Sequence, residues 1–393
     1  MKLILSFLYL ISCPWIAYTL AEPIQATQTE KGNKQSHSTP FAERVNIQSE
    51  PAMPGQIIDN QWVVVGTPAL HAFQLDSGLL YKGRPSFRFE LREDDNLLTG
   101  YNPGETKGRI ETSYCYATPQ DFEHLPLKTF SQSKLLRTVY HHGKGQCAQG
   151  SRWKYEFAIW VPDTLSRDAN TLFAQWHGMP RRNLIQTPQG EIKELTEEEF
   201  LQLQESMLFA KELGYEKIQS VNKQGKITYK KGKKNGWRIE QGGYPPLSFG
   251  FSKGFFYIKA NSDSKWFSDK TDRTNADVAR TKSMGSVSSE YKTSTLAYKL
   301  PIEQFPRNQW VHFDMEVQWS QYVAERDTML KPGCLDVRMT AQGQTRHIVN
   351  QAILPIGRND RDGYYFKHGI YRTSSSTIPV AYHLAGYTQN ELK

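Results

Sequence analysis

The sequence predicts an all-β fold, a two-sheet antiparallel sandwich or β-jelly-roll, from which one basic, helix-containing insertion projects. Three observations favour this class. Aromatic residues make up 12% of the chain, apolar and polar side chains alternate along many short segments, and Gly, Pro, Asn or Asp separates one segment from the next. This pattern is typical of antiparallel all-β domains. With 38% hydrophobic and 22% charged residues in 393, the composition excludes disordered, collagen-like and coiled-coil chains.

The first residues predict a targeting segment. Lys2 precedes an apolar run at 3–10, and small residues end at Ala21, which indicates a signal peptide over 1–21 and export to the periplasm or the outer-membrane surface. Residues 10–13 also resemble a bacterial lipobox, in which Cys13 would carry a lipid anchor. Both readings stay open. The polar stretch 22–49 predicts a lead-in or linker.

Twelve later segments predict strands, and we assign 50–180 and 240–393 to the sandwich. The predicted strands are 61–66, 86–91, 108–117, 154–161, 171–177, 247–251, 255–260, 293–300, 310–319, 335–340, 364–371 and 380–384.

A single helix is expected, over about 197–213. Thr196 and Glu199 form a capping box, and Gly214 is a candidate C-cap. In the basic tract that follows, the KGKKNG run at 231–236 is expected to break both helix and strand. We therefore assign 181–239 to an insertion that projects from the sandwich.

The basic tract carries the whole charge excess of the protein. Eight cations and no acid lie between Lys217 and Arg238, whereas the rest of the chain balances 40 cations against 40 acids. In an exported chain this favours a sulfated polymer over nucleic acid as partner, although a lysine-rich loop can also be plain solvated surface. Candidate anion-binding lysines are Lys230, Lys231, Lys233 and Lys234.

The cysteines argue against a structural role for disulfides or zinc. If Cys13 leaves with the signal, Cys115, Cys147 and Cys334 remain, an odd number without metal-ligand spacing.

Three predicted strands have a polar second face. Side chains alternate along a strand, so Gln175 and His177 share a face, as do Arg109 and Glu111. On the third strand Tyr365, Lys367, Gly369 and Tyr371 share one, and a glycine there marks close approach of a ligand or of another backbone. The alternatives are a hydrogen-bonded histidine, an Arg109–Glu111 surface ion pair and an amphipathic exposed strand.

Together these residues fit β-elimination from a uronic acid. Removal of the C5 proton increases the negative charge at the carboxylate, and Arg109 and Gln175 are suited to neutralise it. A neutral imidazole, His177, serves as the base, and the phenol of Tyr371 protonates the leaving oxygen. In an iduronate, H5 and O4 lie on opposite faces of the ring, so base and acid must be two residues.

The motifs resemble those of the heparinase I family of heparin lyases. They are GETKGR at 104–109, YHHGKG at 140–145, FAQWHG at 173–178, NGW at 235–237 with EQGGYP at 240–245, and the segment 357–371, and the resemblance runs from about residue 44 to 387. A weaker similarity, confined to the site residues, extends to jelly-roll alginate lyases.

The resemblance implies a jelly roll with a basic, thumb-like extension that eliminates 4-linked, 2-O-sulfated iduronate in heparin and heparan sulfate. It implies catalytic roles for His177 and Tyr371 and substrate contacts for Arg109, Gln175 and Lys367. Family members carry a cysteine at the position of Cys147, which we interpret as a buried thiol because elimination needs no nucleophile. A histidine present in the insertion of some relatives is absent here. Arg84, Arg88 and Lys144 are further candidates for the cleft.

The resemblance also implies a structural calcium ion. Its candidate ligands are Glu240, the backbone carbonyl of Trp266 and Asn359, since Ca²⁺ prefers carboxylate, amide and carbonyl oxygens. Asp360 and Asp362 are further acids there, although 359–363 also fits a simple hairpin turn. No organic cofactor and no protein partner is implied. Two alternatives to a heparin lyase remain: a non-catalytic sulfated-glycan-binding jelly roll and a lyase of another uronate polymer such as alginate.

Overall fold

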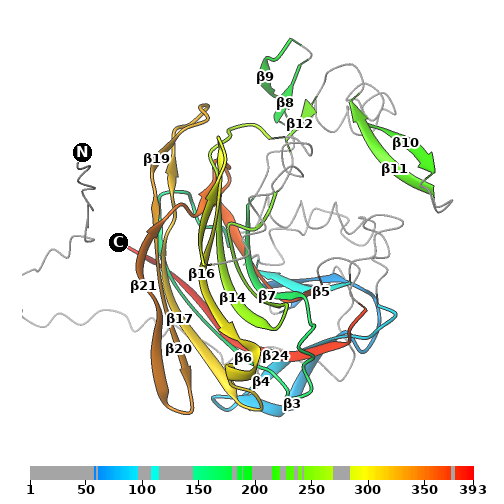
Figure 1. The fold of residues 1–393 in the computed structure, drawn as a ribbon, viewed down its shortest axis with the longest axis vertical. Helices are drawn as coiled ribbons and strands as arrows, with labels where there is room; N and C mark the ends of the chain where they lie inside the picture. The colour runs from blue at the N-terminus through cyan, green and yellow to red at the C-terminus, as the bar shows by residue number, and fades with distance from the viewer. Residues whose placement is uncertain are drawn as a thin grey trace, which may run out of the picture.

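Burial alternates along β17 (Trp310–Gln318), and this strand illustrates how the fold is built. Val311 and Phe313 are fully buried, whereas Asp314 and Glu316 lie on the opposite face. Because successive side chains of a strand point to opposite faces, one face of β17 packs inward and the other faces solvent. The computed structural model repeats this pattern in two facing sheets (Figure 1).

The structure describes much of the chain from residue 57 onward. The described ranges are 57–58, 61–95, 108–114, 145–178, 184–187, 189–196, 215–221, 227–233, 238–240, 243–268, 284–372 and 377–393, with the backbone alone at 57, 215–221, 227–233 and 239. The predicted signal peptide, lead-in and helix at 197–213 lie outside them. Within these ranges no helix has the length and hydropathy needed to cross a bilayer.

The larger sheet has ten strands. In spatial order they are β1 (Ile57–Ile58), β2 (Trp62–Gly66), β5 (Arg109–Tyr114), β23 (Tyr364–Arg372), β7 (Thr171–Gly178), β13 (Leu247–Ser252), β14 (Phe255–Asp263), β16 (Lys292–Pro301) and β15 (Gly285–Ser288), with β22 (Gly357–Arg358) parallel to β14. The other neighbours in this sheet pair antiparallel.

The second sheet has seven antiparallel strands. Their order is β21 (Gln344–Leu354), β20 (Gly333–Ala341), β17, β6 (Arg152–Trp160), β24 (Val380–Leu392), β4 (Arg84–Leu91) and β3 (Phe73–Tyr81). All twelve predicted strand segments overlap observed strands, so the all-β, two-sheet prediction is confirmed.

Aromatic side chains join the two sheets. The ring centroid of Phe249, in the ten-stranded sheet, lies 5.4 Å from that of Phe157 and 5.3 Å from that of Phe313, both in the seven-stranded sheet. All three are fully buried. Each buried phenylalanine stabilises the sandwich by about 1.5–3 kcal/mol relative to an exposed one, so this core fixes how the sheets face each other.

Two strands of the seven-stranded sheet, β21 and β3, are not predicted by the sequence. β21 lies at the edge and its residues are mostly exposed, so its sequence lacks an apolar face. In β3 a register shift follows Asp76, whose Oδ1 accepts a hydrogen bond from the Gly78 amide. An irregularity of this kind removes the period-two pattern that predicts a strand.

The break in strand structure expected at 231–236 is wrong for 231–233, which continue a strand, and 234–236 lie outside the described residues. β10 (Tyr215–Val221) and β11 (Ile227–Lys233) form an antiparallel hairpin with Tyr215 opposite Lys233, and Figure 1 draws it outside the two large sheets. Ile227, Thr228 and Tyr229 have high β-propensity, which outweighs the single Gly232. β8 (Leu184–Gln186), β9 (Ile192–Glu194) and β12 (Arg238–Ile239) form a separate three-stranded sheet, and β18 (Gln321–Tyr322) pairs with β19 (Met329–Lys331).

A histidine is buried between the sheets. His368 stacks on Trp62 at 4.4 Å between ring centroids, and neither ring nitrogen has a hydrogen-bond partner among the described residues. Burial lowers the pKa of His368 to about 3, against the opposing effect of the Glu111 charge. The ring is therefore neutral and packs as an apolar side chain.

We expect His368→Phe to lose less stability than the wild type when pH falls from neutral to about 5. An unfolded histidine takes up a proton near pH 6.5, whereas native His368 does so only near pH 3, so acid favours the unfolded state throughout this window. His177 has a lowered pKa too and keeps part of the dependence in the variant. Urea unfolding at both pH values measures the difference, and an equal loss in both proteins would contradict the expectation.

Candidate active site

Three neighbouring strands carry the predicted site residues on one face. β23 lies between β5 and β7, with Lys367 opposite Gln175 and Tyr365 opposite His177. Cross-strand partners project to the same face, and Phe366, between Tyr365 and Lys367, belongs to the core. These four side chains therefore lie on the face of the ten-stranded sheet that is turned away from the seven-stranded sheet. We call it the open face.

Tyr371 joins the same face. It pairs with Arg109 of β5 and with Leu172 of β7, and the guanidinium carbon of Arg109 lies 4.6 Å from the centroid of its ring. His177 and Tyr371 thus lie on one face of two adjacent strands. Lys367 and Gln175 lie between them along the sheet.

A buried carboxylate organises the cations on this face. Glu111, 1% exposed, accepts a hydrogen bond from Lys367 Nζ at 2.9 Å and forms an ion pair with Arg109 Nε at 3.0 Å, both through Oε2. Gln175 Nε2 donates to its other oxygen. Sequence reasoning noted only a possible Arg109–Glu111 surface pair. The shared face of the two residues was the available signal that Glu111 belongs to the site.

The charge states follow from this packing. Burial alone would raise the pKa of Glu111, but the charges of Lys367 and Arg109 and the hydrogen bonds outweigh it, so the pKa is lowered and the group is ionised. Burial lowers the pKa of Lys367 to about 8 despite the Glu111 charge, which leaves the amine protonated at neutral pH. Two cations around one carboxylate give the cluster a net positive charge.

His177 is a neutral imidazole beside these cations. Burial, and then the charges of Lys367 and Arg109, lower its pKa to about 4. Its Nδ1 lies 3.0 Å from the carbonyl oxygen of Gly178, and its ring centroid lies 5.7 Å from that of Tyr365. If Nδ1 donates its proton to that carbonyl, Nε2 carries the free lone pair.

Gly369 is required by a neighbouring backbone rather than by a ligand. Its φ is +133°, and a Cβ at this position would lie 2.4 Å from the carbonyl oxygen of Ile110 and 2.5 Å from the Cα of Glu111. The sequence left open which of the two approached the glycine. The close contact brings β5 and β23 together where Glu111 meets its partners.

Other predicted residues are not brought to this cluster. Arg84 and Arg88 lie in β4 of the seven-stranded sheet, on the face opposite its core residues Phe87 and Phe89, and Arg88 pairs with Glu90 at 2.6 Å. Their expected place in the cleft is therefore wrong. Lys144 and Lys234 lie outside the described residues, and of Lys230, Lys231 and Lys233 the structure describes only the backbone, in β11.

Cys147 is a buried thiol, 1% exposed. The Tyr155 hydroxyl donates a hydrogen bond to its Sγ at 2.9 Å, and burial raises the pKa of the thiol to about 12. Because the thiolate is the nucleophilic form of cysteine, this residue is unsuited to covalent catalysis.

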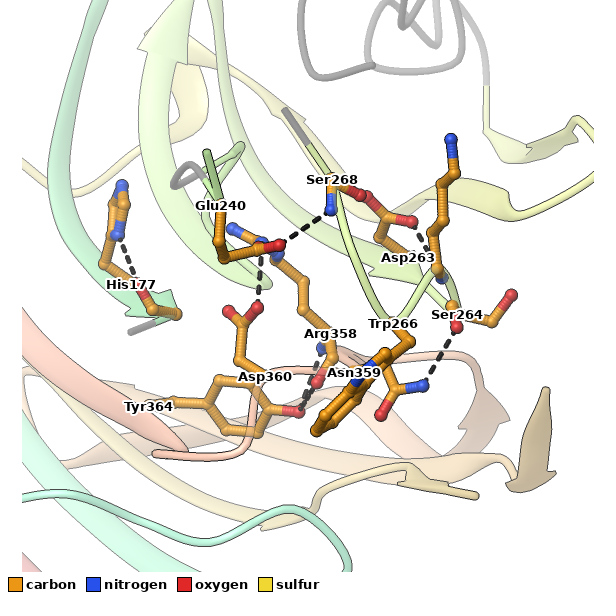
Figure 2. A network of polar contacts seen from close by, with 12 residues as sticks. His177, Glu240, Asp263, Ser264, Trp266, Ser268, Arg358, Asn359, Asp360 and Tyr364 are labelled. Atoms are coloured by element: carbon orange, nitrogen blue, oxygen red, sulfur yellow. Dashed lines mark hydrogen bonds and ion pairs between the residues drawn. The ribbon is translucent and has the colours of Figure 1, made fainter. Parts of the chain in front are cut away.

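Figure 2 draws the predicted metal ligands in one region, together with Arg358, whose guanidinium lies 3.8 Å from the Glu240 carboxylate. Glu240 Oε2 accepts a hydrogen bond from the Ser268 amide at 2.7 Å, and the Trp266 amide donates to Asp327 at 2.8 Å. Asp360 pairs with Arg358 at 2.8 Å. Gly178, next to His177, leaves room for this carboxylate, since a Cβ there would lie 2.0 Å from Asp360 Oδ2.

Asn359 presents an oxygen to this region. Its Nδ2 donates to three backbone carbonyls, those of Arg326 at 2.7 Å, Ser264 at 3.0 Å and Val323 at 3.3 Å, which fixes the orientation of the amide. Oδ1 is buried and has no hydrogen-bond partner in the described part of the chain. The described residues include no group of three His, Cys, Asp or Glu side chains that could hold a metal. An amide oxygen, a carbonyl and a single carboxylate fit Ca²⁺ better than a transition metal.

Comparisons with known proteins identify the family of this chain. Residues 55–384 match the family described as polysaccharide lyase. The chain is 52% identical over 360 residues to Heparin lyase I of Pedobacter heparinus, covering 91% of this chain and 93% of that protein. The chain belongs to the polysaccharide lyase family, and it is a lyase.

Solved structures of other lyases are more distant. An endo-β-1,4-glucuronan lyase from the fungus Trichoderma reesei is 10% identical, with a TM-score of 0.37 over 81% of this chain and 85% of that one. Alginate lyase AlyC3 is 13% identical, with a TM-score of 0.34 over 82% of this chain and 79% of that one.

Proposed function

We propose that this lyase cleaves heparin and heparan sulfate by β-elimination at 2-O-sulfated iduronate. The observation that carries the proposal is the 52% identity to a protein named Heparin lyase I over nearly the whole of both chains. The open face supplies the chemistry, because a neutral imidazole, a phenol and a net positive cluster share it.

The cluster around Glu111 would bind the carboxylate of the reacting uronate. Its net charge is positive, because Arg109 and Lys367 surround the single carboxylate of Glu111. As the C5 proton leaves, negative charge grows on the substrate carboxylate, and fixed cations stabilise that charge without reorganising.

His177 would accept the C5 proton, and Tyr371 would protonate the departing O4. Being neutral, His177 has a lone pair for the proton, and Tyr371 lies on the adjacent strand against the guanidinium of Arg109. Two separate residues suit iduronate, whose H5 and O4 lie on opposite faces of the ring.

The insertion at 181–239, with its predicted helix, would bind the polymer beyond the reacting sugar. The eight cations between Lys217 and Arg238 include those of the β10–β11 hairpin. Lysines give contacts to sulfates that tolerate differences in sugar sequence, and the affinity falls with salt. We also propose that the chain is exported by residues 1–21, with lipidation at Cys13 as the alternative form of the mature end.

We expect the protein to raise the ultraviolet absorbance of heparin and heparan sulfate solutions, since elimination leaves an unsaturated product. His177→Ala should lower kcat by about a thousandfold while keeping heparin affinity, because it removes a general base and no charge. Chondroitin sulfate and alginate serve as comparison polymers. If alginate is turned over faster than heparin, alginate is the substrate instead. If the protein binds a polymer but turns over none, it is a non-catalytic binding module.

The pH dependence should separate free enzyme from the substrate complex. The acid limb of kcat/KM should lie near pH 4, since activity is lost as pH falls through the pKa of His177 and the imidazole becomes protonated. A bound polyanion offsets the charges of Lys367 and Arg109, so the acid limb of kcat should lie at higher pH. Full profiles with heparin measure both limbs. Persistence of the acid limb in both profiles when His177 is replaced by alanine would contradict His177 as the base.

We propose further that the Glu240 carboxylate, the Trp266 carbonyl and Asn359 Oδ1 hold a calcium ion. The fixed orientation of the Asn359 amide and its buried oxygen support this ligand set. Bound calcium would supply positive charge that stabilises the segment around Asp360, and the reaction requires no step at the ion.

Calcium should raise the thermal midpoint of the wild type, because a ligand that binds only the native state stabilises it, and chelation should reverse the effect. Asn359→Leu should abolish most of this rise, whereas Asn390→Leu, at an exposed position of β24, should retain it. Calorimetry with and without the ion measures the shift. If calcium raises the thermal midpoint of Asn359→Leu as much as that of the wild type, Asn359 is not a ligand.

A further inference from the structure

The open face continues beyond β7 and carries a second lysine. Gln175 of β7 lies opposite Ser248 of β13, and Ser248 lies opposite Lys259 of β14. Since Lys367 lies opposite Gln175, the four residues form one cross-strand row. Residues in such a row project to the same face. Lys259 therefore points to the side of the sheet that carries the Glu111 cluster.

The spacing leaves room for substrate between the two lysines. Strands lie about 4.8 Å apart, so the Cα of Lys259 is about 10 Å from that of Gln175. Only Ser248, a small residue, stands between them in the row. A sugar that follows the reacting one across the sheet would pass over Ser248 to reach Lys259.

Lys259 has no anion of its own among the described residues. No ion pair or hydrogen bond joins its ammonium group to the described part of the chain, and Glu111 is already bonded to Lys367, Arg109 and Gln175. Burial lowers the pKa of Lys259 to about 8, so the amine remains charged at neutral pH. A partly buried ammonium without a counter-ion is costly, and an external anion would offset that cost.

A neighbouring tyrosine lies over the same region. Gly250 of β13 has no side chain, and a Cβ there would lie 2.9 Å from the hydroxyl of Tyr257 and 3.0 Å from Leu172 Cδ2. The Tyr257 side chain therefore crosses β13 toward Leu172, the cross-strand partner of Tyr371. Its ring and hydroxyl extend a polar, aromatic surface from β14 to the proposed catalytic row.

We propose that Lys259 is a substrate-binding residue that contacts a sulfate on the sugar next to the reacting uronate. The inference rests on the proposed function for the identity of the polymer. The location of the contact follows from the strand register, from the small size of Ser248 and from the lack of a counter-ion for Lys259 among the described residues.

Steady-state kinetics of Lys259→Met and Lys259→Arg test the proposal, with Lys331→Met, at an exposed position of β19, as the matched loss of charge. Lys259→Met should raise KM for heparin about tenfold or more, the loss expected for a hydrogen bond to a charged group. Lys259→Arg should recover most of the lost affinity, and the KM of Lys331→Met should stay within about twofold of the wild-type KM. Repeating the series on heparin that keeps the 2-O-sulfate of iduronate but lacks the sulfates of the adjacent glucosamine tests the contact directly. The effect of Lys259→Met should disappear there, and an undiminished effect would overturn a sulfate contact.

A KM for Lys259→Met within twofold of wild type on heparin would overturn the inference, provided that its thermal midpoint matches wild type. If this variant fails to fold, Lys259→Gln replaces it. Should the wild type leave every polymer intact, the proposed function fails, and equilibrium binding of a heparin oligosaccharide by wild type and Lys259→Met still decides the role of Lys259. Weaker binding by the variant supports it, and equal binding overturns it.

Discussion

The rest of the site depends on the ion pairs of the buried carboxylate of Glu111. Strand register places Arg109 and Lys367 on one face of the sheet, and the negative charge of Glu111 holds both of them by ion pairs. Removing one partner from such a buried group typically costs about 3–5 kcal/mol, since the remaining charge is left uncompensated. Glu111 therefore fixes the positions of both cations before any substrate arrives, and leaves one positive charge in excess.

In the proposed reaction these cations would have two opposing effects. They would attract an anionic sugar, yet the same charges lower the pKa of His177 and would make it a weaker base. The negative charge of a bound polymer would offset theirs. His177 would therefore be most basic when the site is occupied, which would limit proton abstraction from other molecules.

Much of the fold could be predicted from the sequence because the strands follow a period of two. The same periodicity placed Gln175 with His177 and Arg109 with Glu111. It could not show that Glu111 is buried, because its partner Lys367 is 256 residues away and meets it only through strand pairing. Nor could it orient Asn359, whose amide is fixed by carbonyls of three separate positions. Arg84 and Arg88 are candidates for the cleft in the sequence, but the order of the strands puts them on the other sheet.

Gly178 contacts both the His177 ring and the segment around Asp360, which are far apart in the sequence. Its carbonyl is 3.0 Å from the His177 ring, and the space where its side chain would stand is filled by Asp360. A larger residue at 178 would displace the Asp360 carboxylate, and it would do so beside the carbonyl that contacts the imidazole. A substitution meant to change the segment around Asp360 therefore also falls next to His177.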